Sequence, residues 1–447
     1  MAQHTGLRWN DVKLNPLQLR SLGEIRSGRG QATRRTNLGA HPNADRPGRS
    51  AGARVVRATI DAGRFTTVTG PNPTVFLDAS TAEPLLPEAR TAWLAAQDSG
   101  WGDPLRLHRP GRLAAQALDQ ARAVVAEAVG ARPDEVVFTG PGPQTAAAAI
   151  DGLALGRRRV GRTMITSAIE HSAVLATTAA AGEPVRIGVD RLGRIDLAAW
   201  SAAVAEDGVA AAVLQVANHE VGTVQPYADA AEASRAAGVP LVLDATAALG
   251  RIDLRDAGPW SIMIGSAAAF GGPASVGFMI IRRGTRWRAP YPVDDYQDGR
   301  WPGPPDVPAI VAAAVALRTW LDQPEIGVRQ RALIDRVRAE LGTAVADVDL
   351  VGDPDLRVPH LLTFSVLYVD GETLTLELDR AGIAAASGSA CSASAETPSH
   401  VLAAMGALTH GNLRIGLTRS STEADVDRLI TALPPIVAGI RARLDAP

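Results

Sequence analysis

From Val75 onward, short apolar runs alternate with Ala-rich stretches of helical spacing. We interpret seven of these runs as buried strands, at residues 136–139, 163–167, 185–189, 210–216, 240–244, 262–266 and 276–281. Helical patterns at 113–129, 197–205 and 228–237 separate several of them. This alternation predicts an α/β fold in which helices cover both faces of a seven-stranded, mostly parallel sheet. Ligands of such sheets collect at the carboxyl ends of the strands.

A helical pattern from 308 to 344, interrupted at Pro324, follows the last of these strands. Proline ends or kinks a helix, so we expect the break to lead into a second, smaller domain. We therefore divide the chain into a basic N-terminal extension (1–73), a large domain (74–323) and a small α+β C-terminal domain (324–447). The first apolar run, near 75–78, is expected to join the small domain.

Residues 1–73 differ in composition from the remainder. They contain twelve basic and four acidic residues, a formal charge of about +8, and because the whole chain carries −2 the remainder carries about −10. Their Gly, Pro, Asn and Arg content is typical of a disordered segment. The extension is interpreted as an overlong start or a solvated tail, with a transit peptide or an anion-binding arm as alternatives.

Composition excludes several classes of function. The net charge is near zero and no Lys/Arg stripe marks the main body, so nucleic acid is not an expected partner. No apolar run approaches the roughly 20 residues that span a bilayer, so we expect no membrane association. A single cysteine excludes a disulfide framework and a multi-cysteine metal site. These features fit a reducing cytoplasm.

Several segments, taken in order, resemble the cysteine desulfurases of the class V aminotransferase family. They are residues 169–175 (IEHSAVL), 217–226 (ANHEVGTVQP), 244–247 (DATA), 270–273 (FGGP), 386–392 (ASGSACS), 398–402 (PSHVL) and 413–415 (LRI). The resemblance implies fold type I of the enzymes that depend on pyridoxal phosphate (PLP). It also implies a homodimer with active sites at the subunit interface. The family reaction converts L-cysteine to L-alanine and leaves the sulfur as a persulfide, here on Cys391, for uses such as iron–sulfur cluster assembly.

The resemblance also assigns roles to individual residues. His171 would stack on the cofactor ring and assist proton transfer, and Asp244 would pair with the ring nitrogen. Asn218 would contact the ring's phenolic oxygen, Ser266 the phosphate, and Arg414 the substrate carboxylate.

Each of these residues also has a structural interpretation. His171 follows a strand and could simply occupy a turn, and Asp244 could cap the next helix. Asn218 and Ser266 suit turns or caps equally well, and Arg414 could lie on the surface of a strand. Cys391 stands among Ala, Ser and Gly, a composition that cannot pack into a core, so we expect an exposed, mobile loop.

The chain departs from the family pattern at the cofactor itself. Ala269 stands at the position of the Schiff-base lysine, and the only lysine of the chain is Lys13. Ala268 and Ala247 replace a histidine and a glutamine that contact the cofactor. Other changes affect phosphate contacts: Pro143 lies in the phosphate-binding turn, and Pro304 replaces a threonine that reaches the neighbouring subunit. Covalent binding of PLP is therefore not expected, and non-covalent binding is expected to be weak at best.

Two interpretations of function follow. The first is a cysteine desulfurase by descent, strongly impaired, with Cys391 as the sulfur acceptor. The second is a non-catalytic homologue or pseudoenzyme: a scaffold, a regulatory half of a heterodimer with an active relative, or a persulfide carrier that serves a sulfur-acceptor protein. Another carbon–sulfur or carbon–selenium lyase of the same fold faces the same objection from Ala269.

Overall fold

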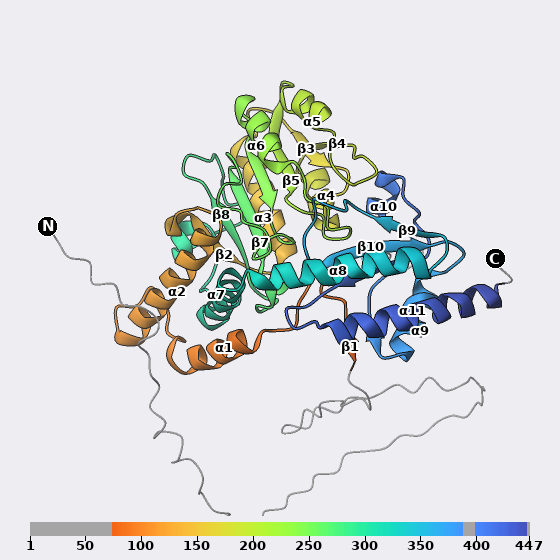
Figure 1. Ribbon diagram of the computed structural model, residues 1–447. Coiled ribbons are helices and arrows are strands. Elements are labelled where there is room, and N and C mark those ends of the chain that lie inside the picture. Colours follow the sequence, from red (N-terminus) through yellow and green to blue (C-terminus); the bar gives the residue numbers. More distant parts are fainter. Residues whose placement is uncertain (1–73, 388–397, 445–447) are drawn as a thin grey trace, which may run out of the picture. The chain divides into compact units, whose positions relative to one another are not determined.

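The computed structural model describes residues 74–387 and 398–444, which belong to the second of two units of the chain, residues 69–447. The centre of this unit is a seven-stranded sheet with the order β2-β8-β7-β6-β5-β3-β4 (Figure 1). Its strands are β2 (Val136–Thr139), β3 (Thr163–Ser167), β4 (Glu183–Ile187), β5 (Val209–Gln215), β6 (Leu241–Asp244), β7 (Ile262–Ser266) and β8 (Gly277–Ile281). All neighbouring strands are parallel except that β8 is antiparallel to both β2 and β7. The predicted mostly parallel sheet of seven strands is confirmed.

The sheet is buried on both faces, and its side chains alternate between two apolar layers. Every residue of the central strand β5 is buried, as expected of a parallel strand covered on both sides. Ala212 and Leu214 contribute to one hydrophobic cluster, whereas Ala211 and Val213 contribute to the other. Because successive side chains of a strand point to opposite faces, this division shows a three-layer α/β/α arrangement.

Different helices cover the two faces of the sheet. Helix α3 packs against β5, β7 and β8 on one side, while α7 packs against α1 and α2 on the other. The helices of this part are α1 (Pro87–Ser99), α2 (Arg109–Ala128), α3 (Gly142–Gly156), α4 (Ser172–Ala181), α5 (Leu197–Val204), α6 (Tyr227–Ala236) and α7 (Val307–Leu321). Short 3-10 helices are η3 (Pro133–Glu135), η4 (Ala267–Phe270) and η5 (Tyr296–Gly299).

A third apolar cluster, formed by Val75 and Leu77 together with residues after Pro324, has its own sheet. Strand β10 (Leu361–Val366) pairs antiparallel with β9 (Val348–Val351) and β12 (Asn412–Gly416). Helices α8 (Glu325–Ala344), α9 (Gly371–Arg380) and α11 (Glu423–Arg443) contribute to this cluster, and α10 (His400–Met405) follows the 388–397 segment. Strand β1 (Val75–Phe76) pairs in parallel with β11 (Ile383–Ala384), so the first described strand joins residues from the C-terminal part.

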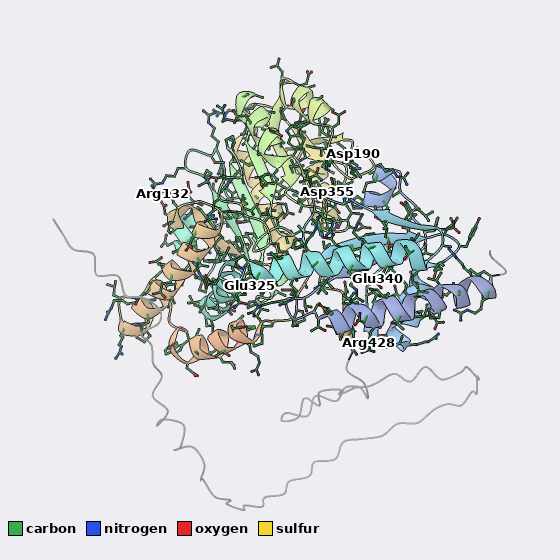
Figure 2. All side chains as sticks on the ribbon, in the orientation of Figure 1. Arg132, Asp190, Glu325, Glu340, Asp355 and Arg428 are labelled. Carbon is green, nitrogen blue, oxygen red and sulfur yellow. The ribbon has the colours of Figure 1, made fainter. Side chains whose placement is uncertain are left out.

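Charged side chains such as Arg132, Asp190 and Glu325 are exposed on the outside of these elements (Figure 2). Within the described ranges, none of the helices combines the length and apolar character needed to cross a bilayer.

Candidate functional site at the strand ends

A cavity of about 270 Å³ opens at the carboxyl ends of β5, β6 and β7, beside the first turns of α3 and α4. This is the position at which α/β sheets bind their ligands. Its lining is formed by Ser80, Thr81, Pro141, Gly142, Pro143, Ala146, His171, Ala173, Val174, Gln215, Ala217, His219, Asp244, Thr246, Ala247, Ser266, Ala268 and Ala274. We call it the strand-end cavity. Three of the site residues expected from the sequence lie in its wall: His171, Asp244 and Ser266.

His171 caps helix α4. Its Nδ1 atom accepts a hydrogen bond from the Ala173 N–H at 3.1 Å. A neutral imidazole that accepts at Nδ1 carries its hydrogen on Nε2, so His171 can donate a hydrogen bond from its other nitrogen. Burial lowers the pKa of His171, although the Asp244 carboxylate partly opposes the shift. At neutral pH this histidine is therefore a hydrogen-bond donor, and taking up a second proton would break the helix cap.

His219 is a second imidazole of the cavity, which the sequence interpretation did not single out. Its ring meets that of His171 edge to face, with centroids 5.1 Å apart. The Nδ1 atom of His219 is buried and has no hydrogen-bond partner among the described residues. Burial, followed by the His171 and Arg414 charges, places the pKa of His219 well below its usual range. The sequence could have pointed to His219, because it lies in the 217–226 segment directly after Asn218.

Asp244 and Ser266 stand at the carboxyl ends of the paired strands β6 and β7. The Asp244 Oδ1 atom accepts a hydrogen bond from the Thr246 N–H at 2.9 Å, so this carboxylate stabilises the turn that follows its strand. Within residues 74–387 and 398–444 this is the hydrogen bond that the carboxylate makes, and the residue also lines the cavity. Ser266 lies close to the first turn of α3, since a Cβ atom on Gly142 would be 3.2 Å from the Ser266 Cβ.

Asn218 lies behind the wall of the cavity. Its Nδ2 atom donates to the Ile169 carbonyl at 3.0 Å, and its Oδ1 atom accepts from the Glu220 and Val221 N–H groups at 2.8 Å. The amide is thus engaged in the turn that carries His219. The structure places Asn218 in this structural role and not among the lining residues.

Arg414 lies on β12 and is buried. Its positive charge lowers the pKa of Asp78 and of Glu220, in both cases against a larger rise caused by burial. The side chain does not line the cavity, but its field reaches His219. Cys391 lies outside the described residues.

The anion-binding features that a phosphate requires are reduced at this site. Pro143 has no N–H group, and the N–H groups of Gln144 and Thr145 already donate to the Pro141 carbonyl at 2.9 and 3.1 Å. Neither arginine nor lysine is among the lining residues. A phosphate needs convergent N–H donors or cations, so the lining does not fit the phosphate of PLP.

The aldehyde of PLP also lacks a partner. Ala269 lies in η4, is only 4% exposed, and carries a methyl group, which cannot form a Schiff base. Its neighbour Ala268 lines the cavity with another methyl group. Lys13, the only lysine, lies outside the described residues. The described site therefore does not fit PLP as a covalently held cofactor.

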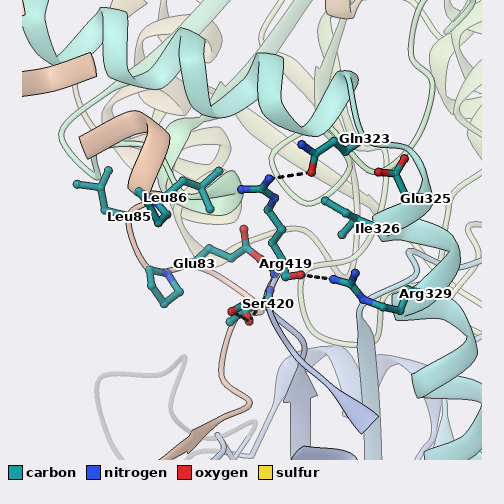
Figure 3. A pocket seen from close by; sticks show the side chains of 12 residues that line it. Glu83, Leu85, Leu86, Gln323, Glu325, Ile326, Arg329, Arg419 and Ser420 are labelled. Carbon is teal, nitrogen blue, oxygen red and sulfur yellow. Dashed lines mark hydrogen bonds between the residues drawn. The ribbon is translucent and has the colours of Figure 1, made fainter. Parts of the chain in front are cut away.

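A larger pocket of about 550 Å³ lies elsewhere, next to the start of α1 and α8 (Figure 3). Arg419 crosses it, donating from Nη2 to Gln323 Oε1 at 2.7 Å, and the Arg329 guanidinium donates to the Arg419 carbonyl. Because its arginines are held by these contacts and by Glu88, we regard this pocket as a structural junction.

Comparison with known proteins places this geometry in context. Residues 99–429 match the family model described as aminotransferase class-V. A cysteine desulfurase from Cereibacter sphaeroides is 36% identical over 378 residues, which cover 82% of this chain and 97% of that protein. The cysteine desulfurase NifS of Azotobacter vinelandii is 34% identical, with coverage of 82% and 93%. The solved structure of a NifS-like protein superposes with a TM-score of 0.75 at 25% identity, covering 82% of this chain and 100% of that one.

Proposed function

This chain belongs to the cysteine desulfurases of the class-V aminotransferase family, and we propose that it keeps the family's sulfur-accepting cysteine but has lost efficient PLP-dependent catalysis. The family is PLP-dependent, so the chemistry of this chain would differ from that of its relatives. We propose that it acts as a persulfide carrier, in which the Cys391 sulfur holds the transferred sulfur atom.

The observation that carries this proposal is the wall of the strand-end cavity at Ala268 and Pro143, together with the buried Ala269 next to it. Each missing charge-assisted hydrogen bond removes about 1.5–3 kcal/mol, and each 1.4 kcal/mol is about a tenfold loss of affinity. Several such contacts are absent, and no alanine methyl can replace an amine in forming an imine. Non-covalent PLP binding would therefore be weak and desulfuration inefficient.

Persulfide transfer to Cys391 needs no cofactor. In the proposed step the Cys391 thiolate attacks the outer sulfur of a donor persulfide, a new sulfur–sulfur bond forms, and the donor leaves as a thiolate. A second thiolate on an acceptor protein would remove the same sulfur in the same way. The two transfers balance without an external oxidant or reductant.

The described residues on either side of the 388–397 segment support a location near the cavity. Ala386 and Arg414 form a backbone bridge, with an N–H to carbonyl distance of 2.7 Å. On the other side, His400 Nε2 lies 2.9 Å from the carbonyl oxygen of Glu170, the residue before His171. The described residues that flank this segment are thus held by Arg414 of β12 on one side and by Glu170, which precedes the cavity residue His171, on the other.

A partner subunit is part of the proposal. Large apolar side chains are exposed between α1 and α2, among them Trp101 (66% exposed) and Leu107 (88% exposed), with Leu105 between them. Exposed apolar groups of this kind mark protein interfaces. We propose a homodimer, or a heterodimer with an active relative, in a cytoplasmic setting suited to a single reduced cysteine.

Sulfur transfer provides the test. We expect the full chain with added PLP to form alanine from L-cysteine at the rate of the protein-free control. After mixing with an active desulfurase and cysteine, mass spectrometry should find one additional sulfur on Cys391, and none in Cys391→Ser. Alanine formation at the rate of an active desulfurase would contradict the loss of catalysis, and an unmodified Cys391 would contradict the carrier role.

A further inference from the structure

The strand-end cavity has one carboxylate in its lining and neither an arginine nor a lysine. From its lining we propose that the cavity binds small organic cations, with an amine head group held by Asp244. The inference concerns the cavity alone and does not depend on sulfur transfer by Cys391.

The charge of the lining supports a cation. Asp244 is its single carboxylate, and neither arginine nor lysine contributes to it. Burial keeps His171 and His219 neutral at pH 7, because it lowers the pKa of both imidazoles. The lining therefore carries a formal charge of about −1 in a partly desolvated space, where a charge interacts more strongly than it does in water.

Polar groups are placed to orient an amine. One Asp244 oxygen is held by the Thr246 N–H, which fixes the carboxylate and leaves the other oxygen for a ligand. His171 can donate from Nε2, because its Nδ1 accepts from the Ala173 N–H. His219 brings a buried, unpartnered Nδ1 beside it. An ammonium group against the carboxylate and a hydrogen-bond acceptor near His171 would match this arrangement.

The rest of the wall combines alanine methyl groups with neutral polar side chains, and the space is small. The methyl groups come from Ala146, Ala173, Ala217, Ala247, Ala268 and Ala274. A volume of about 270 Å³ is just below the range for small-molecule sites, about 300–1,000 Å³. This combination suits a short amine with a small ring or chain.

Charged groups near the strand-end cavity do not reverse its preference for cations. Arg414 is the cation whose field reaches His219, but Asp78 and Glu220 lie within its field as well. Glu170, behind the wall, accepts from the Gln215 N–H at 3.0 Å, and burial raises its pKa well above the usual range. Arg414 is not among the lining residues, so Asp244 is the charged group in contact with the space.

Three probes of similar size and different charge test the inference: benzylamine (cationic), benzyl alcohol (neutral) and benzoate (anionic). Titration of the full chain at pH 7, followed by calorimetry or ligand-observed NMR, should show benzylamine binding at least about tenfold more tightly than benzoate. Benzyl alcohol should lie between them.

Asp244→Asn keeps an acceptor for the Thr246 N–H and removes the charge. We expect it to reduce the preference for benzylamine to within about threefold, while Asp253→Asn, on the exposed surface, should leave the preference unchanged. Equal or tighter binding of benzoate, binding of none of the probes at millimolar concentration, or an unchanged preference in Asp244→Asn would overturn the inference. If Asp244→Asn does not fold, the order of the three probes' affinities for the unaltered chain decides whether the inference holds.

Discussion

At the scale of single residues, Glu83 and Arg251 form an ion pair whose side chains are each about 1% exposed. Their closest nitrogen–oxygen distance is 3.8 Å, which is too long for a hydrogen bond, and the guanidinium nitrogens have no partner among the described residues. The Trp320 ring lies 4.8 Å from the guanidinium carbon. Burial raises the pKa of Glu83 and lowers that of Arg251, so desolvation opposes both charges.

This ion pair predicts that substitutions of Glu83 and Arg251 have strongly non-additive effects on the free energy of unfolding. Glu83→Gln should lower the free energy of unfolding by about 3–5 kcal/mol, because it leaves the Arg251 charge buried and unpaired. Glu83→Gln combined with Arg251→Met should be less destabilised than Glu83→Gln alone, since no charge remains to be desolvated. Urea unfolding of Glu83→Gln, of Arg251→Met and of the double variant measures the coupling. Purely additive effects would show that the two charges do not depend on each other.

Buried neutral histidines predict a loss of stability in acid. Burial places the folded-state pKa of His219 and of His360 well below the usual value, with Arg251 contributing at His360. As the pH falls below about 6.5, the unfolded chain takes up protons that the folded chain does not, so stability decreases. Each histidine contributes a slope of at most about 1.4 kcal/mol per pH unit.

Urea midpoints at pH 7.5 and 5.5 test this prediction. The decrease between the two pH values should be smaller in His219→Asn and in His360→Asn than in the unaltered chain. His410→Asn, which replaces an exposed histidine, is the control and should keep the full decrease. An identical pH dependence in all four proteins would contradict the assignment.

At the scale of elements, the start of α4 depends on the His171 side chain. His171→Ala removes the acceptor for the Ala173 N–H and should lower stability by about 1 kcal/mol. His171→Asn supplies another side-chain acceptor, so it should recover most of that loss. Thermal unfolding of both variants measures the difference. Equal stability of the two variants would indicate that the cap contributes nothing.

The elements themselves were largely predictable from the sequence. Strands β3 and β7 begin and end where their apolar runs do, because parallel strands covered on both faces require continuous apolar residues. The predicted break at Pro324 is also observed, since α7 ends at Leu321 and α8 begins at Glu325.

The site was less predictable, because local sequence does not fix where a turn places its side chains. Asp244 and Ser266 end their strands, and strand ends meet at one edge of the sheet, so their position in the cavity follows from the pattern. Asn218 instead bonds to its own turn and to Ile169, and that turn places His219 in the cavity. This outcome depends on contacts between segments about fifty residues apart.

At the scale of the whole molecule, the exposed apolar residues between α1 and α2 predict assembly. We expect sedimentation equilibrium to show a dimer of the full chain, and Trp101→Ser with Leu107→Ser to shift it toward the monomer. Val328→Ser, at another exposed apolar residue, is the control that should remain dimeric. A monomeric unaltered chain would remove the support for a partner at this surface.

The central claim is that a cysteine desulfurase fold here lacks a covalent hold on PLP. The most direct measurement mixes the full chain with PLP, reduces it with borohydride, and locates adducts by mass spectrometry. We predict no visible aldimine absorbance and no stoichiometric adduct, because Ala269 offers no amine and Lys13 lies in the N-terminal extension. Ala269→Lys is the positive control and should gain an adduct at the new amine. A stoichiometric adduct on the unaltered chain would contradict the account.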